Sequence, residues 1–196
     1  MSYFTINEAR KAARDEVRKS YKTNSRNILE SYVSTASSYD QFDVFLSHSI
    51  NDSDLVLGVK VLLENKGLKV YVDWHDDPQV SRDNVTPKTA DLLRKRMKQS
   101  KSLIYIATKN STESKWMPWE LGFFDGYSDG SVAVLPLMDY SHSSFIGQEY
   151  LGLYPKVEKG VYSDTGGADT FVKNSTSWMT LKGFGKKSES WMSYSK

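Results

Sequence analysis

Apolar and polar positions alternate in two distinct patterns from residue 42 onward. Short, nearly continuous apolar runs predict buried strands, and segments with apolar residues at helical spacing separate them. The predicted strands cover residues 42–47, 68–73, 102–108 and 131–138, with a fifth, weaker strand within 154–162. The predicted helices cover residues 52–66, 87–98, 116–125 and 166–178. This alternation is typical of an α/β domain with a parallel sheet and helices on both faces.

Residues that favour helix ends support these boundaries. Asp52 or Ser53 suits the N-cap of the first of these helices, and Gly67 suits its end. Pro87 suits the first position of the next helix, because the N–H group that proline lacks has no intrahelical partner there.

The first 38 residues follow a different pattern. Apolar residues within 4–33 fall loosely at helical spacing, with a break near residues 23–25, which predicts one or two amphipathic helices. These helices could pack on their own domain or on a second subunit. We therefore expect an N-terminal helical extension with a linker at 1–38, an α/β domain at 39–180, and a polar, poorly ordered C-terminal tail at 181–196.

The ends of the predicted strands indicate where a ligand would bind. In an open parallel sheet, ligands bind beyond the carboxyl ends of the strands, where the strand order reverses. If the order is 2-1-3-4-5, counted along the chain, that point lies between the first and third strands. The first strand ends at Ser47, and the third leads to residues 116–120. These two segments are expected to face one crevice.

Composition narrows the class of protein. The chain has 196 residues, 39% hydrophobic and 26% charged, with a net charge of +2, so nothing demands nucleic acid or an anionic membrane as a partner. Cysteine is absent, which excludes disulfides, a thiolate nucleophile and cysteine-bound zinc. No apolar run approaches the roughly 20 residues that span a bilayer, and the first residues lack the apolar core of a signal peptide. We expect a cytoplasmic protein.

Two common kinds of site are not predicted. No G-x-G-x-x-G motif follows a predicted strand, so a dinucleotide cofactor held as in Rossmann domains is not expected. The histidines His48, His75 and His142 do not have the spacing of metal ligands, and no metal is expected.

Glu120 is the candidate catalytic residue. Pro118 predicts a helix start nearby, which places Glu120 in the first turn, where the partial positive charge of the helix keeps a carboxylate ionised. Trp116 lies about one turn earlier, so its indole could form a wall beside the carboxylate. A glutamate at this position can also serve only to complement the helix dipole. Its place at the predicted crevice, flanked by two tryptophans, makes the two interpretations about equal.

The turn of residues 47–49 also has two interpretations. Small hydroxyl residues after a strand can offer backbone amides and hydroxyl groups to a phosphate or ribose. They can instead cap the helix that follows. His48 has no matched carboxylate in the sequence and is not assigned as a base.

Three blocks of sequence resemble the TIR domain family. They are residues 39–49 (YDQFDVFLSHS), 70–73 (VYVD) and 114–122 (SKWMPWELG), in the family's order and at its spacing. The resemblance covers roughly residues 40–165. It is greatest to bacterial TIR proteins, in particular the TIR component of Thoeris anti-phage systems. It implies a flavodoxin-like fold with a central parallel five-stranded sheet.

The resemblance also implies an activity. Enzymatic members cleave the nicotinamide–ribose bond of NAD⁺, a substrate rather than a cofactor, and form ADP-ribose or a cyclic isomer. The Thoeris proteins are understood to make an ADP-ribose-derived signal that activates a separate effector protein. The family's catalytic glutamate matches Glu120, the tryptophan before it Trp116, and its serine after the first strand Ser47. The residues expected to bind substrate are Ser47, His48, Asp73, Trp74, Arg82 and Trp116.

The segment 74–86 departs from the common pattern, in which many members carry a glycine. In the family this loop gates the site and joins neighbouring subunits, which implies self-association through residues 74–86. Two alternatives stay open: a non-catalytic TIR interaction module, and a nucleoside hydrolase or deoxyribosyltransferase of related fold.

Overall fold

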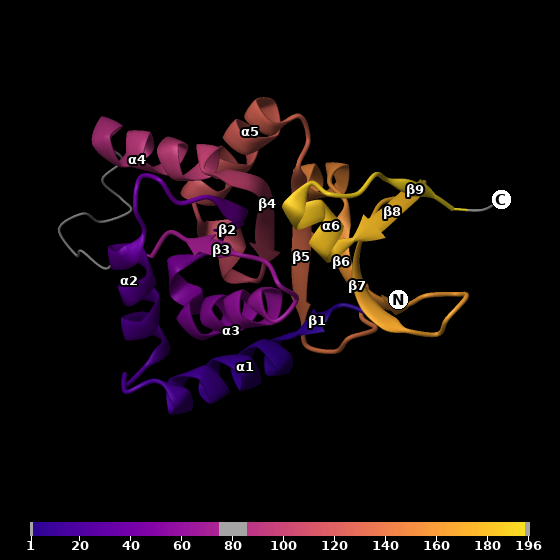
Figure 1. Cartoon of the computed structure of the whole chain (residues 1–196), viewed down its shortest axis with the longest axis horizontal. Helices are drawn as coiled ribbons and strands as arrows, with labels where there is room; N and C mark the ends of the chain where they lie inside the picture. The colour runs from indigo at the N-terminus through magenta and orange to yellow at the C-terminus, as the bar shows by residue number, and fades with distance from the viewer. Residues whose placement is uncertain (1, 75–85, 195–196) are drawn as a thin grey trace.

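The computed structural model describes residues 2–74 and 86–194, in which nine strands form one sheet (Figure 1). Its centre is parallel, in the order β3-β2-β4-β5-β6. These strands are β2 (Phe42–Ser47), β3 (Val70–Val72), β4 (Ser100–Ala107), β5 (Val132–Met138) and β6 (Lys156–Val161). They are the predicted strands, so the α/β class and the order 2-1-3-4-5 of the parallel part are confirmed. The resemblance implied this parallel centre but not the strands that extend the sheet beyond it.

The sheet continues past β6 through antiparallel strands. They are β7 (Ala168–Lys173), β8 (Ser177–Thr180) and β9 (Met192–Ser193). The helix predicted at 166–178 was therefore wrong. Phe171 and Val172 are buried and pair with Glu158 and Val157 of β6, so pairing between distant segments overrides the local helical pattern. The turn between β7 and β8 is stabilised by Asn174, whose Oδ1 accepts backbone N–H bonds of 2.8–2.9 Å.

The segment after β8 begins with a short helix, where the sequence predicted the start of a polar tail. Helix α6 (Leu181–Lys186) begins after Thr180, whose Oγ1 accepts the N–H of Gly183 at 2.9 Å. Leu181 and Phe184 are buried in the core. Gly185 packs so closely that a Cβ there would lie 2.5 Å from a methyl carbon of Leu68. This glycine therefore lets α6 lie directly on the domain.

Helices cover both faces of the sheet, as predicted. Figure 1 shows α1 (Ile6–Lys19) and α3 (Ser53–Glu64) on one side, with α4 (Pro87–Lys98) and α5 (Trp116–Ser128) on the other. Strand β2 contributes to both layers because its side chains alternate. Val44 and Leu46 belong to the core with α1 and α3, whereas Phe45 belongs to the core with α4 and α5. Short 3-10 helices η1 (Ile50–Asp52), η2 (Asn110–Glu113) and η3 (Glu149–Leu153) lie in the connections.

The N-terminal segment packs on its own domain. Strand β1 (Phe4–Thr5) pairs in parallel with β5, and helices α1 and α2 (Ser25–Thr35) follow it. Thr5 and Glu8 form a reciprocal capping box at the start of α1. Glu8 also accepts a bond of 2.6 Å from Lys159 of β6. Helix α1 also packs very closely on α3. A Cβ on Gly58 of α3 would lie only 1.9 Å from the carbonyl oxygen of Ala9 in α1.

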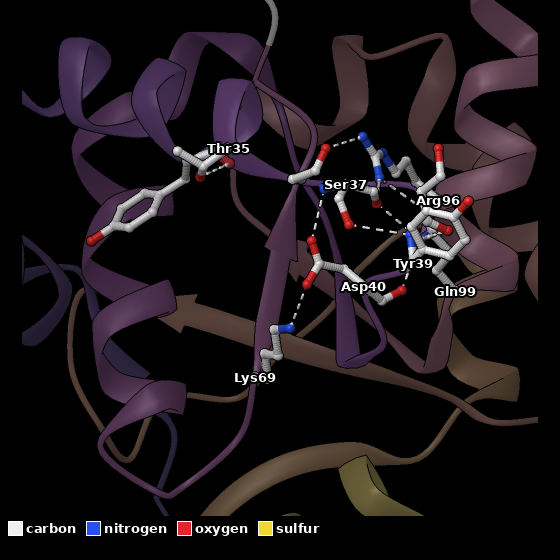
Figure 2. Close-up of polar contacts among 10 residues, drawn as sticks. Thr35, Ser37, Tyr39, Asp40, Lys69, Arg96 and Gln99 are labelled. Atoms are coloured by element: carbon white, nitrogen blue, oxygen red, sulfur yellow. Dashed lines mark hydrogen bonds and ion pairs between the residues drawn. The ribbon is translucent and has the colours of Figure 1, made fainter.

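The connector between α2 and β2 is bonded to the elements on either side of it (Figure 2). Arg96 of α4 donates to the carbonyl oxygen of Ser37 at 2.6 Å, and Gln99 donates to that of Asp40 at 2.7 Å. Lys69 donates to Asp40 Oδ1 at 2.9 Å and, with the N–H of Ser37, lowers the pKa of Asp40 to about 2. The segment predicted as a linker therefore anchors the N-terminal helices to the domain.

Candidate active site

The end of β2 and the first part of α5 meet at Glu120. Ser47, the last residue of β2, donates from Oγ to Oε2 of Glu120 across 2.5 Å. Ser47 is paired with Tyr105 of β4, so both side chains lie on the face of the sheet that α5 covers. The two segments predicted to face each other across the point of strand reversal are thus in direct contact.

Helix α5 begins at Trp116, two residues earlier than Pro118 suggested. Glu120 therefore lies in the second turn, and the prediction that placed it in the first turn was wrong. The partial charge of a helix N-terminus falls off within the first turn, so it contributes less here than expected. The bond from Ser47 does not depend on that partial charge. Charge-assisted bonds of this length are among the stronger ones in proteins.

The Glu120 carboxylate is enclosed by protein. Glu120 is 2% exposed, and Trp116, one turn earlier on the same helix, is 5% exposed. Trp116 packs edge-on against Trp119, with ring centroids 5.3 Å apart. Trp116 and Glu120 share one face of α5, as their spacing predicted. A substrate can reach the carboxylate only if side chains that cover it move.

Tyr105 is a polar neighbour of this pair that the sequence did not reveal. It is fully buried, and its hydroxyl donates to Oε1 of Gln148, which also accepts from Tyr150. Burial, then the contact with Tyr150 and the charge of Glu120, raise the pKa of Tyr105 above its usual range. The phenol therefore stays neutral and can only donate or accept a hydrogen bond. Its position inside an apolar run gave no local signal of a site.

His48, Asp73 and Trp74 form a second buried group beside the first. The rings of His48 and Trp74 are stacked at 5.3 Å and 11°, and these residues are 2% and 1% exposed. His48 Nδ1 lies 2.8 Å from the carbonyl oxygen of Leu46, which can only accept, so Nδ1 carries a proton. Asp73 accepts a bond of 3.3 Å from Tyr71. Trp74 is 1% exposed in this conformation, and its contact with a substrate stays a prediction.

Residues 44–148 match the sequence model of the TIR domain family. The chain belongs to this family. It is 41% identical over 180 residues, 89% of this chain and 93% of the relative, to "Probable 3' cyclic ADP-D-ribose synthase ThsB'" of Bacillus cereus (strain MSX-D12). It is also 35% identical over 83 residues, 42% of this chain and 22% of the relative, to "Putative cyclic ADP-D-ribose synthase TIR2" of Cytobacillus dafuensis.

Two further sequence predictions for this TIR domain concern Arg82 and metal binding. Arg82, one of the residues expected to bind substrate, lies outside the described residues, as does most of the segment 74–86. In residues 2–74 and 86–194, no group of three or more histidine, aspartate or glutamate side chains could hold a metal ion.

Asp52 links the two segments that carry the Ser47–Glu120 pair. It occupies the N-cap position of α3 but makes no capping bond with its side chain. Instead Oδ2 accepts from Thr108 Oγ1 and Oδ1 accepts from Asn110 Nδ2, both at 2.6 Å. Thr108 and Asn110 follow β4 and lead through η2 to α5. The sequence predicted only a helix cap here, so this link across the TIR domain was missed.

Replacing Asp52 with alanine is expected to destabilise the TIR domain by about 2 kcal/mol, because two partly buried donors lose their acceptor. For a chain of this size the melting temperature should fall by roughly 4–8 °C. Asp52→Asn, which keeps one acceptor oxygen, should lie between wild type and alanine. Asp54→Ala, at an exposed position two residues on, is the control. Equal melting temperatures for Asp52→Ala and the control would show that the link contributes nothing.

Proposed function

We propose that this TIR domain releases nicotinamide from NAD⁺ and closes the remaining ADP-ribose into a cyclic signal nucleotide in bacterial anti-phage defence. The buried Ser47–Glu120 pair at the point of strand reversal is the observation that carries the proposal. Identity of 41% to a ThsB′ relative named as a 3′ cyclic ADP-D-ribose synthase, over nearly all of both chains, supports the cyclic product.

The first step is cleavage of the bond between the ribose C1 atom and the ring nitrogen of nicotinamide. The electron pair of that bond returns to the nitrogen, which was cationic, so no acid is needed. The ribose then resembles an oxocarbenium ion, as in glycoside cleavage. The Glu120 carboxylate stabilises this positive charge, and Ser47 fixes its orientation. Fixed charges placed in this way contribute several kcal/mol in a site without water.

The second step forms the ring. A hydroxyl oxygen of the other ribose attacks the same C1 atom, forms a C–O bond and gives its proton to Glu120. For a 3′ cyclic product this is the 3′ hydroxyl. Water competes for the same carbon and would give linear ADP-ribose, so the site must exclude it. The low exposure of Glu120 and Trp116 supports such exclusion.

The substrate-binding residues divide into two groups in this proposal. Ser47 and Trp116 act beside the Glu120 carboxylate. His48, Asp73 and Trp74 act behind them, since their rings and carboxylate are packed against protein. Contact of Arg82 with the substrate stays a sequence prediction.

The wider role is proposed from the family alone. It includes self-association through residues 74–86, an effect of the product on a separate effector protein, and a cytoplasmic location. Across residues 2–74 and 86–194, the structure contains no helix with the length and apolar character that a membrane crossing requires.

Mass spectrometry of NAD⁺ incubated with the purified protein tests the proposal. We expect nicotinamide together with a product lighter than ADP-ribose by one water. Linear ADP-ribose as the sole product would contradict the cyclase. NAD⁺ that stays intact at high protein concentration and with phage lysate would favour an interaction module. Base release from nucleosides with NAD⁺ untouched would favour a nucleoside hydrolase.

A further inference from the structure

A cavity of about 330 Å³ lies where the chain leaves η3 and enters β6, beside the end of β7. Glu158, Lys156 and Lys173 line it, together with Asn174 and Tyr194. We call it the Glu158 cavity. Ser47, Trp116 and Glu120 are not among its lining residues, so it is separate from the candidate active site. Its volume is at the small end of the range for small-molecule sites.

The carboxylate of Glu158 is buried in the wall of this cavity. Glu158 is 8% exposed, and among the described residues its Oε2 has no hydrogen-bond partner. Burial, and then the charge of Glu158 and a hydrogen bond to it, raise the pKa of Tyr3. One side of the carboxylate therefore has a phenol donor and the other has none. A buried oxygen without a hydrogen-bond donor lowers the stability of the fold by about 1–3 kcal/mol, and by more when the group is charged.

The two lysines of the cavity lie directly opposite each other on β6 and β7. Like charges at such positions destabilise a strand pair. In the described part of the chain, no ion pair includes Lys156 or Lys173. By contrast Lys159, which points to the other face of β6, is paired with Glu8 at 2.6 Å. Neither cavity lysine has an ion-pair partner of this kind among the described residues, although Lys173 Nζ lies over the ring of Phe171, 4.9 Å from its centroid.

Charge limits what can fill the Glu158 cavity. A simple anion would meet Glu158, and a simple cation would meet two lysines. A divalent metal needs several oxygen ligands, and one carboxylate does not supply them. We propose that the cavity binds a small zwitterion of the amino-acid class, with its cationic N–H group on Glu158 Oε2 and its carboxylate between Lys156 and Lys173.

Binding requires a small opening, since Oε2 is covered in this conformation. Tyr194, 39% exposed, is a lining side chain that can move aside. A phosphate could replace the carboxylate of the ligand, because both anions suit a lysine pair. AMP and inorganic phosphate are therefore included in the test.

Thermal shift and NMR titration of the full chain test the proposal. Each standard amino acid is added in turn, with agmatine as a cation without a carboxylate, inorganic phosphate as an anion, and AMP. At least one amino acid should raise the melting temperature and shift the backbone amide signals of Lys156 and Glu158. Agmatine and phosphate should bind at least about tenfold more weakly. No binding by any amino acid, equal binding by agmatine or phosphate, or preference for AMP would overturn the proposal.

Variants separate this site from the active site. Glu158→Gln removes a buried charge without changing shape, so the protein should fold, and it should weaken binding of the best amino acid by about tenfold or more. Lys173→Met should weaken it similarly, whereas Lys182→Met, on the exposed face of α6, should not. Unchanged binding by Glu158→Gln would refute the site. Nicotinamide release should be the same in all three variants, so this test stands or fails independently of the proposed enzymatic function.

Discussion

Replacing Glu120 with glutamine is expected to abolish measurable nicotinamide release while leaving the fold intact. The amide has the shape of the carboxylate and can still accept the bond that Ser47 donates across 2.5 Å. It carries no negative charge, so it cannot stabilise an oxocarbenium-like sugar. Removal of one hydrogen-bond donor from an oxyanion hole lowers kcat by about 100- to 1000-fold. Since Glu120 supplies a full charge, we expect a loss of about 1000-fold or more.

Initial rates of nicotinamide release, followed by chromatography, measure this effect. Glu113→Gln is the matched control, because it makes the same chemical change at an exposed position in η2, before α5. It should keep the wild-type rate. Melting curves of both variants should match that of the wild type. NAD⁺ turnover by Glu120→Gln at the control's rate would remove this carboxylate from the mechanism.

Most strands of the parallel part could be predicted because they are buried on both faces, whereas β6 is only partly buried. Strands buried on both faces are mostly apolar, and the predicted run FDVFLS matches β2 residue for residue. Contact between Ser47 and Glu120, 73 residues apart, followed from the strand order rather than from any local signal. A rule of topology thus brought two distant residues together.

The start of α5 could not be placed from proline alone. The first N–H groups of a helix have no intrahelical acceptor, so proline is tolerated throughout the first turn and not only at its first position. Pro118 is the third residue of α5. A prediction that takes proline as the first residue moves Glu120 from the second turn to the first.

Side-chain hydrogen bonds across the domain could not be predicted from the sequence. Asp52 has every local feature of a helix cap, yet both its oxygens bond to residues that follow β4. Similarly, β7 and β8 are stabilised by pairing with β6 and by the edge contact of Phe171 with Trp178 at 5.3 Å. Such partners are distant in sequence or defined only by the fold, so residue periodicity does not record them.

Replacing Gly58 with alanine is expected to destabilise the protein by about 3 kcal/mol, at the upper end of the usual cost of an oversized core residue. An added Cβ would lie 1.9 Å from the carbonyl oxygen of Ala9 and 2.5 Å from its carbonyl carbon. These are backbone atoms inside α1, so no side chain can rotate away. Helix α1 would have to shift as a whole, although β1, just before it, is paired with β5.

Alanine in place of Gly126 should stabilise the protein, in contrast to alanine in place of Gly58. Gly126 lies on the exposed side of α5, where a Cβ would meet nothing within 4 Å. Alanine there should stabilise the protein by about 0.5–1 kcal/mol, because glycine is the less favourable residue in a helix interior. The melting temperature should fall by roughly 6–12 °C in Gly58→Ala and rise by a few degrees in Gly126→Ala. If Gly58→Ala melts at or above the wild-type temperature, α1 does not lie on α3 as described, and the N-terminal segment is not an integral part of this domain.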